Sequence, residues 1–258
     1  FSEKFVTHYR MSDKLSGPWT SPIEDTFDAR TFYAAKTAQI GDKRMAFAWV
    51  PTKRGESDFG QYEWGGNFIA HEINQTTDNK LTVKPAEGLI NMFNKEFVNE
   101  KLNKVEIENY EGEKSYVIDG MKDTCMIEAV IEFSEGVRSF GIGLRQDSAL
   151  ANGYYLRFEP FYNRIVADMW PRRIRGVNQW YVDGDKPFMV ELERPFDYKS
   201  LKDNKVHIRV VADGSIICLY VNDITALTMR AYNLNRTNWG FFVKDGSIRV
   251  SDIHMYEV

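Results

Sequence analysis

Seven carboxylates in or beside the β-like stretches of the chain could do acid–base chemistry. A retaining glycosidase needs two carboxyl groups about 5 to 5.5 Å apart, one as nucleophile and one as acid/base. Such groups can lie far apart in a sequence, so spacing alone neither identifies nor excludes them. Because most Asp and Glu side chains are solvated surface groups, we assign no catalytic residue among the seven. They are Glu24, Asp25, Asp28, Glu63, Glu72, Glu159 and Asp168.

Other reactive side chains form no motif with a defined chemistry. Cys125 and Cys218 each lie in an apolar β-like run, which favours two buried free thiols, with one disulfide as the alternative. Neither has a His or Cys neighbour at metal-ligand spacing. The pair His71-Glu72 is typical of a structural ion pair. The sequence has no Gly-rich phosphate loop and no nucleophile elbow, so we expect no metal and no cofactor.

A cluster of aromatic and basic residues occurs between residues 170 and 181. Three arginines stand among aromatic rings there, and guanidinium groups stack on rings and pair with carboxylates. Trp170, Arg172 and Trp180 are therefore candidates for binding a glycan, an acidic one included, or a partner. A solvated hairpin tip is the simpler interpretation of the same residues.

Composition sets further bounds on function. The chain has 258 residues, 43% hydrophobic and 27% charged, as is typical of a globular protein. A net charge of -4 does not favour nucleic acid as a partner, and no apolar run approaches the about 18 residues of a membrane span. The aromatic content of 14% suits β structure and is common in sugar-binding proteins. The start, Phe1-Ser2, has no initiator Met and no signal-like core, so we expect a fragment of a longer protein.

The first region, to about residue 84, is predicted to form one antiparallel sheet. Thr31–Ile40 and Lys43–Val50 make a hairpin through Gly41-Asp42, a two-residue turn favoured in tight hairpins. Both faces of Met45–Val50 are apolar, as expected of a sheet packed between two neighbours. The other predicted strands are Lys4–Met11, Gly66–Asn74 and Lys80–Lys84.

The rest of the chain divides into a connection and a strand-rich region. Residues 85–112 are predicted to connect the two, and the apolar spacing of Leu89–Leu102 fits a short helix or an extended tie. From about Lys114 on, β-like runs alternate with turn pairs such as Asp213-Gly214 and Asp245-Gly246. About ten strands at this spacing indicate a two-sheet sandwich of jelly-roll type.

Three motifs in the first region resemble the last propeller blade of glycoside hydrolase family 32. This is the β-fructosidase group of invertases, levanases and inulinases, whose blade carries an Asp, then Phe-Tyr-Ala, a basic pair, a Gly-Trp strand end and a Trp-Gly-Gly turn. The motifs are Asp28 to Thr37, Lys43 to Val50, and Trp64-Gly65-Gly66-Asn67. The C-terminal sandwich of the same family resembles Ser215 to Asn222, Asn238 to Val243, and Ile248 to Val258.

The resemblance implies an all-β architecture. Residues 1–84 would be the last blade of an incomplete five-bladed β-propeller, 85–112 a connecting segment, and 113–258 a C-terminal β-sandwich of jelly-roll or concanavalin-like type. The family carries its nucleophile and its acid/base on earlier blades, so the chain alone is predicted to be inactive. Its parent would be a hydrolase of β-fructosides such as fructan, for which an extracellular or periplasmic location is favoured.

The resemblance also implies three substrate-binding residues. Asp28 matches the Asp that helps to hold the fructosyl unit, with an Asx turn before a strand as the alternative. Trp49 matches the strand-end Trp that lines the sugar pocket, with a blade-interface role as the alternative. Tyr33 is a weaker candidate for the pocket wall. Arg30 stands where the family commonly has Gly, which puts the shape of the pocket in doubt.

Three roles remain open from the sequence. The chain could complete the sugar pocket while the sandwich buttresses the propeller, the sandwich could be a non-catalytic carbohydrate-binding module, or it could be purely structural. The expected partners are a carbohydrate and the missing N-terminal propeller blades. A blade with two apolar faces should not remain exposed to water. We therefore predict that it folds back on the sandwich, associates with a second copy, or is partly disordered.

Overall fold

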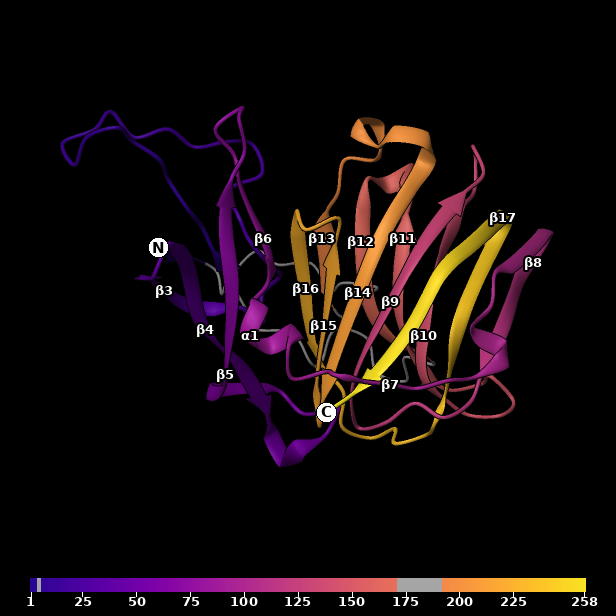
Figure 1. The fold of residues 1–258 in the computed structure, drawn as a ribbon. Coiled ribbons are helices and arrows are strands. Elements are labelled where there is room, and N and C mark those ends of the chain that lie inside the picture. Colours follow the sequence, from indigo (N-terminus) through magenta and orange to yellow (C-terminus); the bar gives the residue numbers. More distant parts are fainter. Residues whose placement is uncertain (4–5, 171–191) are drawn as a thin grey trace.

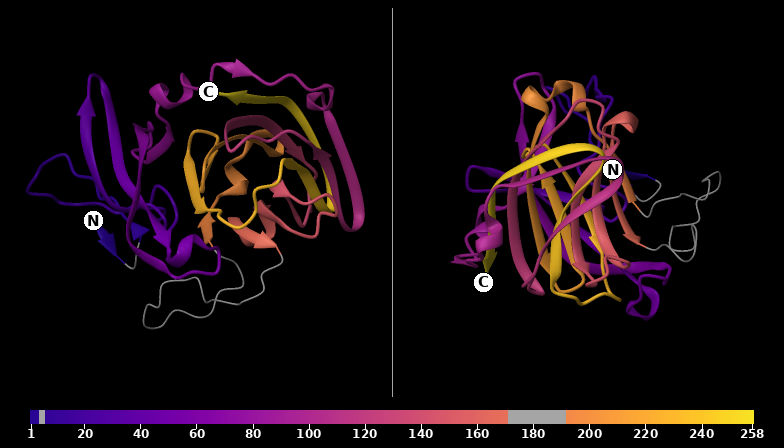
Figure 2. Two further views of the ribbon diagram at one scale, coloured as in Figure 1. Left: turned by 90° about the horizontal axis from the view of Figure 1, so that it is seen from below. Right: turned by 90° about the vertical axis from the view of Figure 1, so that its right-hand side faces the viewer.

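The computed structural model describes residues 1–3, 6–170 and 192–258 and shows an all-β protein (Figure 1). A four-stranded antiparallel sheet, which we call the small sheet, has the order β3-β4-β5-β6. An eleven-stranded antiparallel sheet, which we call the sandwich, curls back on itself until it is nearly closed (Figure 2). The predicted fold class is confirmed. The small sheet consists of β3 (Tyr33–Ile40), β4 (Lys43–Lys53), β5 (Tyr62–Gln75) and β6 (Leu81–Pro85), and a short ladder joins β1 (Ser2–Glu3) to β2 (Val6–Thr7).

One long strand joins the two layers of the sandwich. β17 (Asn238–Glu257) pairs with β10 along its first part and with β9 along its second. The main order is β13-β12-β11-β10-β17-β9-β14-β15-β16, and β7 and β8 also pair with β17. The bounds are β7 (Lys95–Glu96), β8 (Val105–Ile118), β9 (Thr124–Phe133), β10 (Ser139–Gln146), β11 (Gly153–Glu159), β12 (Arg164–Trp170), β13 (Leu192–Pro195), β14 (Lys205–Asp213), β15 (Ile216–Val221) and β16 (Thr225–Arg230).

The local predictions differ in how well they match the elements. The hairpin through Gly41-Asp42 is confirmed, because Ile40 pairs directly with Lys43. The predicted strand Lys4–Met11 is too long: ladder pairing covers Val6–Thr7, while His8 and Met11 each make a single bridge. His8 and Met11 stand at the beginning of an irregular loop, and their bridge partners, Thr26 and Thr20, lie in its later part.

The connection between the sheets is mostly an extended tie. Within Leu89–Leu102 the predicted helix amounts to one turn, α1 (Glu87–Ile90), which begins earlier and has no side-chain cap. The short strand β7 and a 3-10 turn at Glu100–Leu102 follow. β8 starts at Val105 and crosses residue 112, so the first long strand of the sandwich begins inside the predicted connecting segment. In the described part of the chain, no helix could cross a lipid bilayer.

The small sheet packs with one face on the sandwich. Ala46 and Ala48 of β4 share a buried cluster with Cys218 and Tyr220 of β15 and with Ala226 of β16. This face is the inner face of the small sheet, and Figure 1 shows β16 and β15 as the sandwich strands nearest to it. Of the three expected arrangements, the structure has the one in which this sheet folds back on the sandwich.

Candidate functional site

Three aromatic side chains meet at one end of the small sheet, and we call them the aromatic cluster. Its members are Tyr33, Trp49 and Trp64. The ring centroids lie 5.8 Å apart for Tyr33 and Trp49, 5.2 Å for Trp49 and Trp64, and 5.7 Å for Tyr33 and Trp64. Trp64 is 72% exposed, while the other two are half-buried. The structure therefore brings two of the predicted sugar-binding residues together and adds a third ring.

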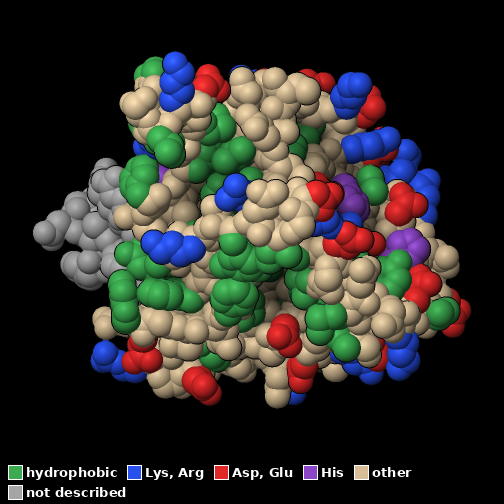
Figure 3. All heavy atoms as spheres, turned by 60° about the vertical axis from the view of Figure 1, so that its left-hand side comes forward, with side chains coloured by type: hydrophobic (Ala, Val, Ile, Leu, Met, Phe, Trp, Pro, Cys, Tyr) green, Lys and Arg blue, Asp and Glu red, His purple; other side chains and the backbone are tan. Residues whose placement is uncertain are grey.

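The register of the strands explains why these rings share a face. Tyr33 stands opposite Trp49, and Trp49 stands opposite Phe68, so all three point to the outer face, away from the sandwich. Phe47 and Phe68 stack 5.4 Å apart beside the cluster. Figure 3 shows hydrophobic side chains gathered on the side of the molecule where the small sheet comes forward. Exposed rings of this kind can cover the apolar face of a sugar, and an indole Nε1 can donate to a hydroxyl.

Two glycines position Trp64 at the start of β5. Gly65 has φ 91°, a left-handed conformation that costs an L-residue strain. Gly66 pairs with Pro51, and a Cβ at Gly66 would overlap the carbonyl oxygen of Val50. The Trp-Gly-Gly motif thus lets β5 approach β4 closely, which holds Trp64 against Trp49.

We expect Gly66→Ala to destabilise the protein because its methyl group would push β5 away from Val50. Overpacking of this kind costs about 1 to 3 kcal/mol, and the fluorescence of the nearby tryptophans should shift as the cluster opens. Urea unfolding and emission spectra check both effects. Gly88→Ala is the matched control, since a Cβ there meets nothing within 4 Å and alanine favours the helix. Equal stability of the two variants would contradict this account.

Asp28 lies away from the aromatic cluster, between the small sheet and the sandwich. It is 2% exposed, and both carboxylate oxygens accept hydrogen bonds from protein groups. Oδ1 accepts from the backbone N–H of Ala29 and of Thr228, each at 2.7 Å. Oδ2 accepts from the Thr228 hydroxyl and lies 3.1 Å from His71 Nε2. A sugar hydroxyl could reach Asp28 only by displacing these donors, and Asp28 lies apart from Trp49 and Tyr33; its role in binding a sugar stays a prediction.

The physical reason is the alternation of side chains along a strand. His71 pairs with Ala46 and shares its inner face, whereas Trp49 belongs to the outer face. The carboxylate that binds His71 must therefore lie on the sandwich side. The predicted alternative, an Asx turn, would use the N–H two residues after Asp28; the structure instead has a hydrogen bond from the N–H of the next residue, Ala29.

The electrostatics of Asp28 match a stable anion. Burial alone would raise its pKa, but the hydrogen bond and charge of His71 and the two donors of Thr228 outweigh burial and hold the pKa below its usual value. Cys218 Sγ lies 3.2 Å from the Thr228 hydroxyl, and burial raises the pKa of this thiol far above its usual value. Neither group is poised for acid–base or nucleophilic chemistry.

A buried arginine of the sandwich holds the strand ends that carry the cluster. Arg230, at the end of β16, donates through Nε to Pro51 O at 3.0 Å and through Nη2 to Val50 O at 2.7 Å. Nη2 also donates to Asn67 Oδ1 at 2.6 Å. These acceptors directly follow Trp49 on β4 and Gly66 on β5. The sandwich therefore fixes the end of the small sheet through one side chain.

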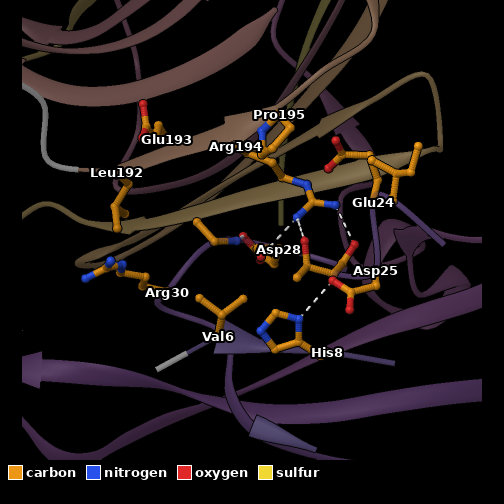
Figure 4. Close-up of a pocket in the computed structure, with 13 residues that line it drawn as sticks. Val6, His8, Glu24, Asp25, Asp28, Arg30, Leu192, Glu193, Arg194 and Pro195 are labelled. Atoms are coloured by element: carbon orange, nitrogen blue, oxygen red, sulfur yellow. Dashed lines mark hydrogen bonds and ion pairs between the residues drawn. The ribbon is translucent and has the colours of Figure 1, made fainter. Parts of the chain in front are cut away.

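Two more polar contacts join the sheet region to the sandwich. Asp58 accepts from the Tyr154 hydroxyl at 2.6 Å and from the backbone N–H of Tyr232 at 2.8 Å. The buried Arg194 of β13 donates to the backbone of Thr26 and of Asp28. Figure 4 shows Arg194 reaching across a hollow of about 390 Å³ toward these residues. The hollow lies at the same junction, and in its walls His8 pairs with Asp25 while Arg194 pairs with Thr26 and Asp28.

The predicted binding residues of the sandwich fall at or beyond the edge of the described residues. Trp170 is the last residue of β12, and Arg172 and Trp180 lie outside the described residues. Their role in binding a glycan stays a prediction.

The two cysteines and the pair His71-Glu72 have structural roles. Cys125 and Cys218 are buried and free, as predicted. His71 and Glu72 do not pair, because neighbouring strand residues face opposite ways; Glu72 instead pairs with Lys84, at 3.1 Å. In residues 1–3, 6–170 and 192–258, no group of His, Cys, Asp or Glu could hold a metal ion.

Sequence reasoning missed two residues of this arrangement. Trp64 was visible as part of the Trp-Gly-Gly motif, but the motif did not reveal that its ring joins Trp49. Arg230 carried no local signal, because its acceptors lie 179 and 180 residues away in the chain.

The comparisons with known proteins agree with this architecture. Residues 173–255 match the family model described as GH32, BT1760-like, C-terminal domain. No curated protein sequence matches the chain.

Solved structures share the fold at low sequence identity. An exo-inulinase from Aspergillus awamori matches with a TM-score of 0.67 and 14% identity, over 98% of this chain and 50% of that one. A fructan 1-exohydrolase IIa from Cichorium intybus, in complex with 1-kestose, matches with a TM-score of 0.59 and 14% identity, over 90% of this chain and 49% of that one. A β-fructofuranosidase from Aspergillus kawachii matches with a TM-score of 0.60 and 11% identity, over 98% of this chain and 50% of that one. The chain thus spans about half the length of these structures. It carries a GH32-like C-terminal domain of the BT1760-like type, on the fold of the C-terminal half of the GH32 fructosidases and inulinases.

Proposed function

We propose that this chain is the C-terminal part of a glycoside hydrolase that acts on β-fructosides. The small sheet would be the last blade of its propeller, and the aromatic cluster would form one wall of the sugar pocket. The observation that carries the proposal is the exposed outer face, where Trp64 and Phe68 remain open to solvent beside Trp49. Apolar patches of this kind mark binding or contact surfaces.

Two parts of the outer face would have different roles. The stacked pair Phe47 and Phe68 would pack against a neighbouring blade, as blades of a propeller do. The cluster of Tyr33, Trp49 and Trp64 would face the sugar. The chicory enzyme of similar fold was solved with 1-kestose, which makes this trisaccharide a suitable probe. The catalytic carboxylates would belong to the N-terminal blades, so the chain alone would hydrolyse neither sucrose nor fructan.

The sandwich would act as a buttress. Asp28, Arg230 and Asp58 bind across the junction through buried hydrogen bonds. Such contacts make the small sheet and the sandwich one unit, so that the rings keep their places. A purely structural sandwich and a carbohydrate-binding sandwich remain the alternative roles for this part of the chain.

A titration with 1-kestose tests the proposed site. Tryptophan emission of the chain should change in a saturable way, and Trp64→Ala should weaken the affinity about tenfold because it removes an exposed stacking ring. Trp19→Ala is the matched control, since Trp19 is an exposed tryptophan of the N-terminal loop outside the cluster. A chain that shows no saturable response, or a Trp64→Ala variant that binds normally, would refute the site. Chromatography of the sugar after incubation should show no hydrolysis; turnover would refute the placement of catalysis outside this chain.

A further inference from the structure

The sandwich has a second surface with the features of a binding site, away from the small sheet. It lies on the outer side of β10, β11 and β17, opposite to the core. In β10 the core residues Phe140 and Ile142 alternate with Gly141 and Gly143, which have no side chain. Gly141 stands in register between Arg157 and Phe242. A hollow of about 520 Å³ lies on this face, and we call it the trough; its floor includes Ser139, Tyr155 and Phe242.

Positive charge dominates the walls of this trough. Four cationic and two acidic side chains line it: Arg138, Arg157, Arg164, Lys244, Glu113 and Glu159. Basic lining of this kind is unusual for a chain whose net charge is -4. Arg164 also pairs with Glu193 and Arg138 with Asp245, so Arg157 and Lys244 are the cations that most favour an anionic ligand here.

A buried carboxylate holds two of the arginines in place. Glu159 is 8% exposed and accepts from Nε of Arg157 and Nε of Arg164, each at 2.6 Å. Because only Nε of Arg157 is hydrogen-bonded within the described part of the chain, its two Nη groups can bind a carboxylate of a ligand. The ammonium group of Lys244 likewise has no hydrogen-bond or ion-pair partner among the described residues. The guanidinium groups are thus pre-oriented, which reduces the entropy lost on binding.

Two exposed rings stand at the end of the trough. Phe161 is 82% exposed and Tyr162 59% exposed, and their centroids lie 5.2 Å apart. A tight turn holds them: Asn163 adopts φ 49° and donates to Pro160 O at 3.1 Å. A second hollow of about 510 Å³ shares Arg138 and Tyr162 with the first. The two hollows therefore adjoin at Arg138 and Tyr162, and we call them together the groove.

We infer that this groove binds an oligosaccharide that carries carboxylate groups. The apolar faces of its sugar rings would lie on Tyr162 and Phe161, while Arg157, Arg138 and Lys244 would bind the carboxylates. A neutral fructan offers no charge to these cations, so this ligand differs in class from that of the aromatic cluster. The inference does not depend on the function proposed above.

Calorimetric titration of the full chain tests this inference with three probes: tetragalacturonic acid, the neutral fructan tetrasaccharide nystose, and citrate. Tetragalacturonic acid should bind, and raising the salt to about 1 M, where the Debye length is about 3 Å, should weaken it strongly. Nystose should not compete for the groove. Citrate that binds as tightly would show that the sugar rings play no part, and no heat with tetragalacturonic acid would end the proposal.

Surface variants locate the site without threatening the fold. Tyr162→Ala should weaken the binding of tetragalacturonic acid about fivefold, because a stacking ring is lost. Lys244→Gln should reduce both the affinity and its salt dependence. Arg249→Gln is the matched control, because Arg249 is an exposed sandwich arginine that pairs with Glu106 outside the groove. Unchanged binding in Tyr162→Ala and Lys244→Gln would place the ligand elsewhere and overturn the assignment.

Discussion

Asp28→Ala is expected to lower the free energy of unfolding by about 3 to 5 kcal/mol, the usual cost of removing one partner from a buried charged network. The carboxylate has no access to solvent and accepts from Thr228, Ala29 and His71. Its loss leaves the buried backbone N–H groups of Thr228 and Ala29 without their carboxylate acceptor, and each such group is costly to bury. Denaturant unfolding monitored by tryptophan emission measures the effect.

Two comparisons separate this network from a general effect of losing a charge. Asp78→Asn removes an exposed carboxylate that pairs with Lys80, and it should leave the stability unchanged. Thr228→Val removes one donor, so the double variant with Asp28→Ala should lose less than the sum of the two single losses. Additive losses, or a loss below about 1 kcal/mol for Asp28→Ala, would show that the network does not hold the junction.

The pH dependence gives the same network a second signature. The folded pKa of Asp28 lies below its usual value, so the stabilisation is complete above the unfolded pKa of about 3.9 and is lost as the pH falls through the folded value. The stability difference between the natural chain and Asp28→Asn should therefore be constant from neutral pH to about 5 and shrink below about 4. A difference that grows on acidification would contradict the assigned charge of Asp28.

Local sequence signals predicted the elements because each depends on few neighbouring residues. The Gly41-Asp42 hairpin follows from backbone freedom at Gly41, which adopts φ 64°. The apolar residues on both faces of Met45–Val50 predicted a strand with two covered faces, and its inner face is covered by the sandwich. The same pattern could not reveal which surface covers which face, because the sequence of a strand does not identify the elements that pack on it.

The junction could not be predicted because its contacts join distant parts of the chain. Asp28 and Thr228 are 200 residues apart, and a buried Asp looks in the sequence like any polar residue before a strand. The resemblance to a sugar-binding Asp therefore favoured a ligand, whereas the structure places protein donors around both oxygens. Trp49 and Tyr33 were predicted from the family resemblance, and the structure brings them together because they pair across one hairpin and share a face.

Arg230→Met is expected to lower the free energy of unfolding by about 3 kcal/mol and to weaken the response of the aromatic cluster to 1-kestose. The side chain is buried and donates to Pro51, Val50 and Asn67. Methionine fills a similar volume but leaves two buried carbonyls without a donor, which accounts for most of the loss in stability. The effect on binding is indirect, because the strand ends that Arg230 holds are those that carry Trp49 and Trp64.

The two effects can be measured apart. Sugar titrations at a temperature where Arg230→Met is fully folded report positioning alone, and its emission spectrum should show a more exposed Trp49. Arg230→Lys should restore part of the stability, since an ammonium group can reach one carbonyl. It should not restore the planar guanidinium contacts that join Val50 O to Asn67. Arg249→Met serves as the exposed control on the same sandwich. A folded Arg230→Met chain that binds 1-kestose like the natural one would show that the sandwich stabilises the small sheet without setting the geometry of its rings.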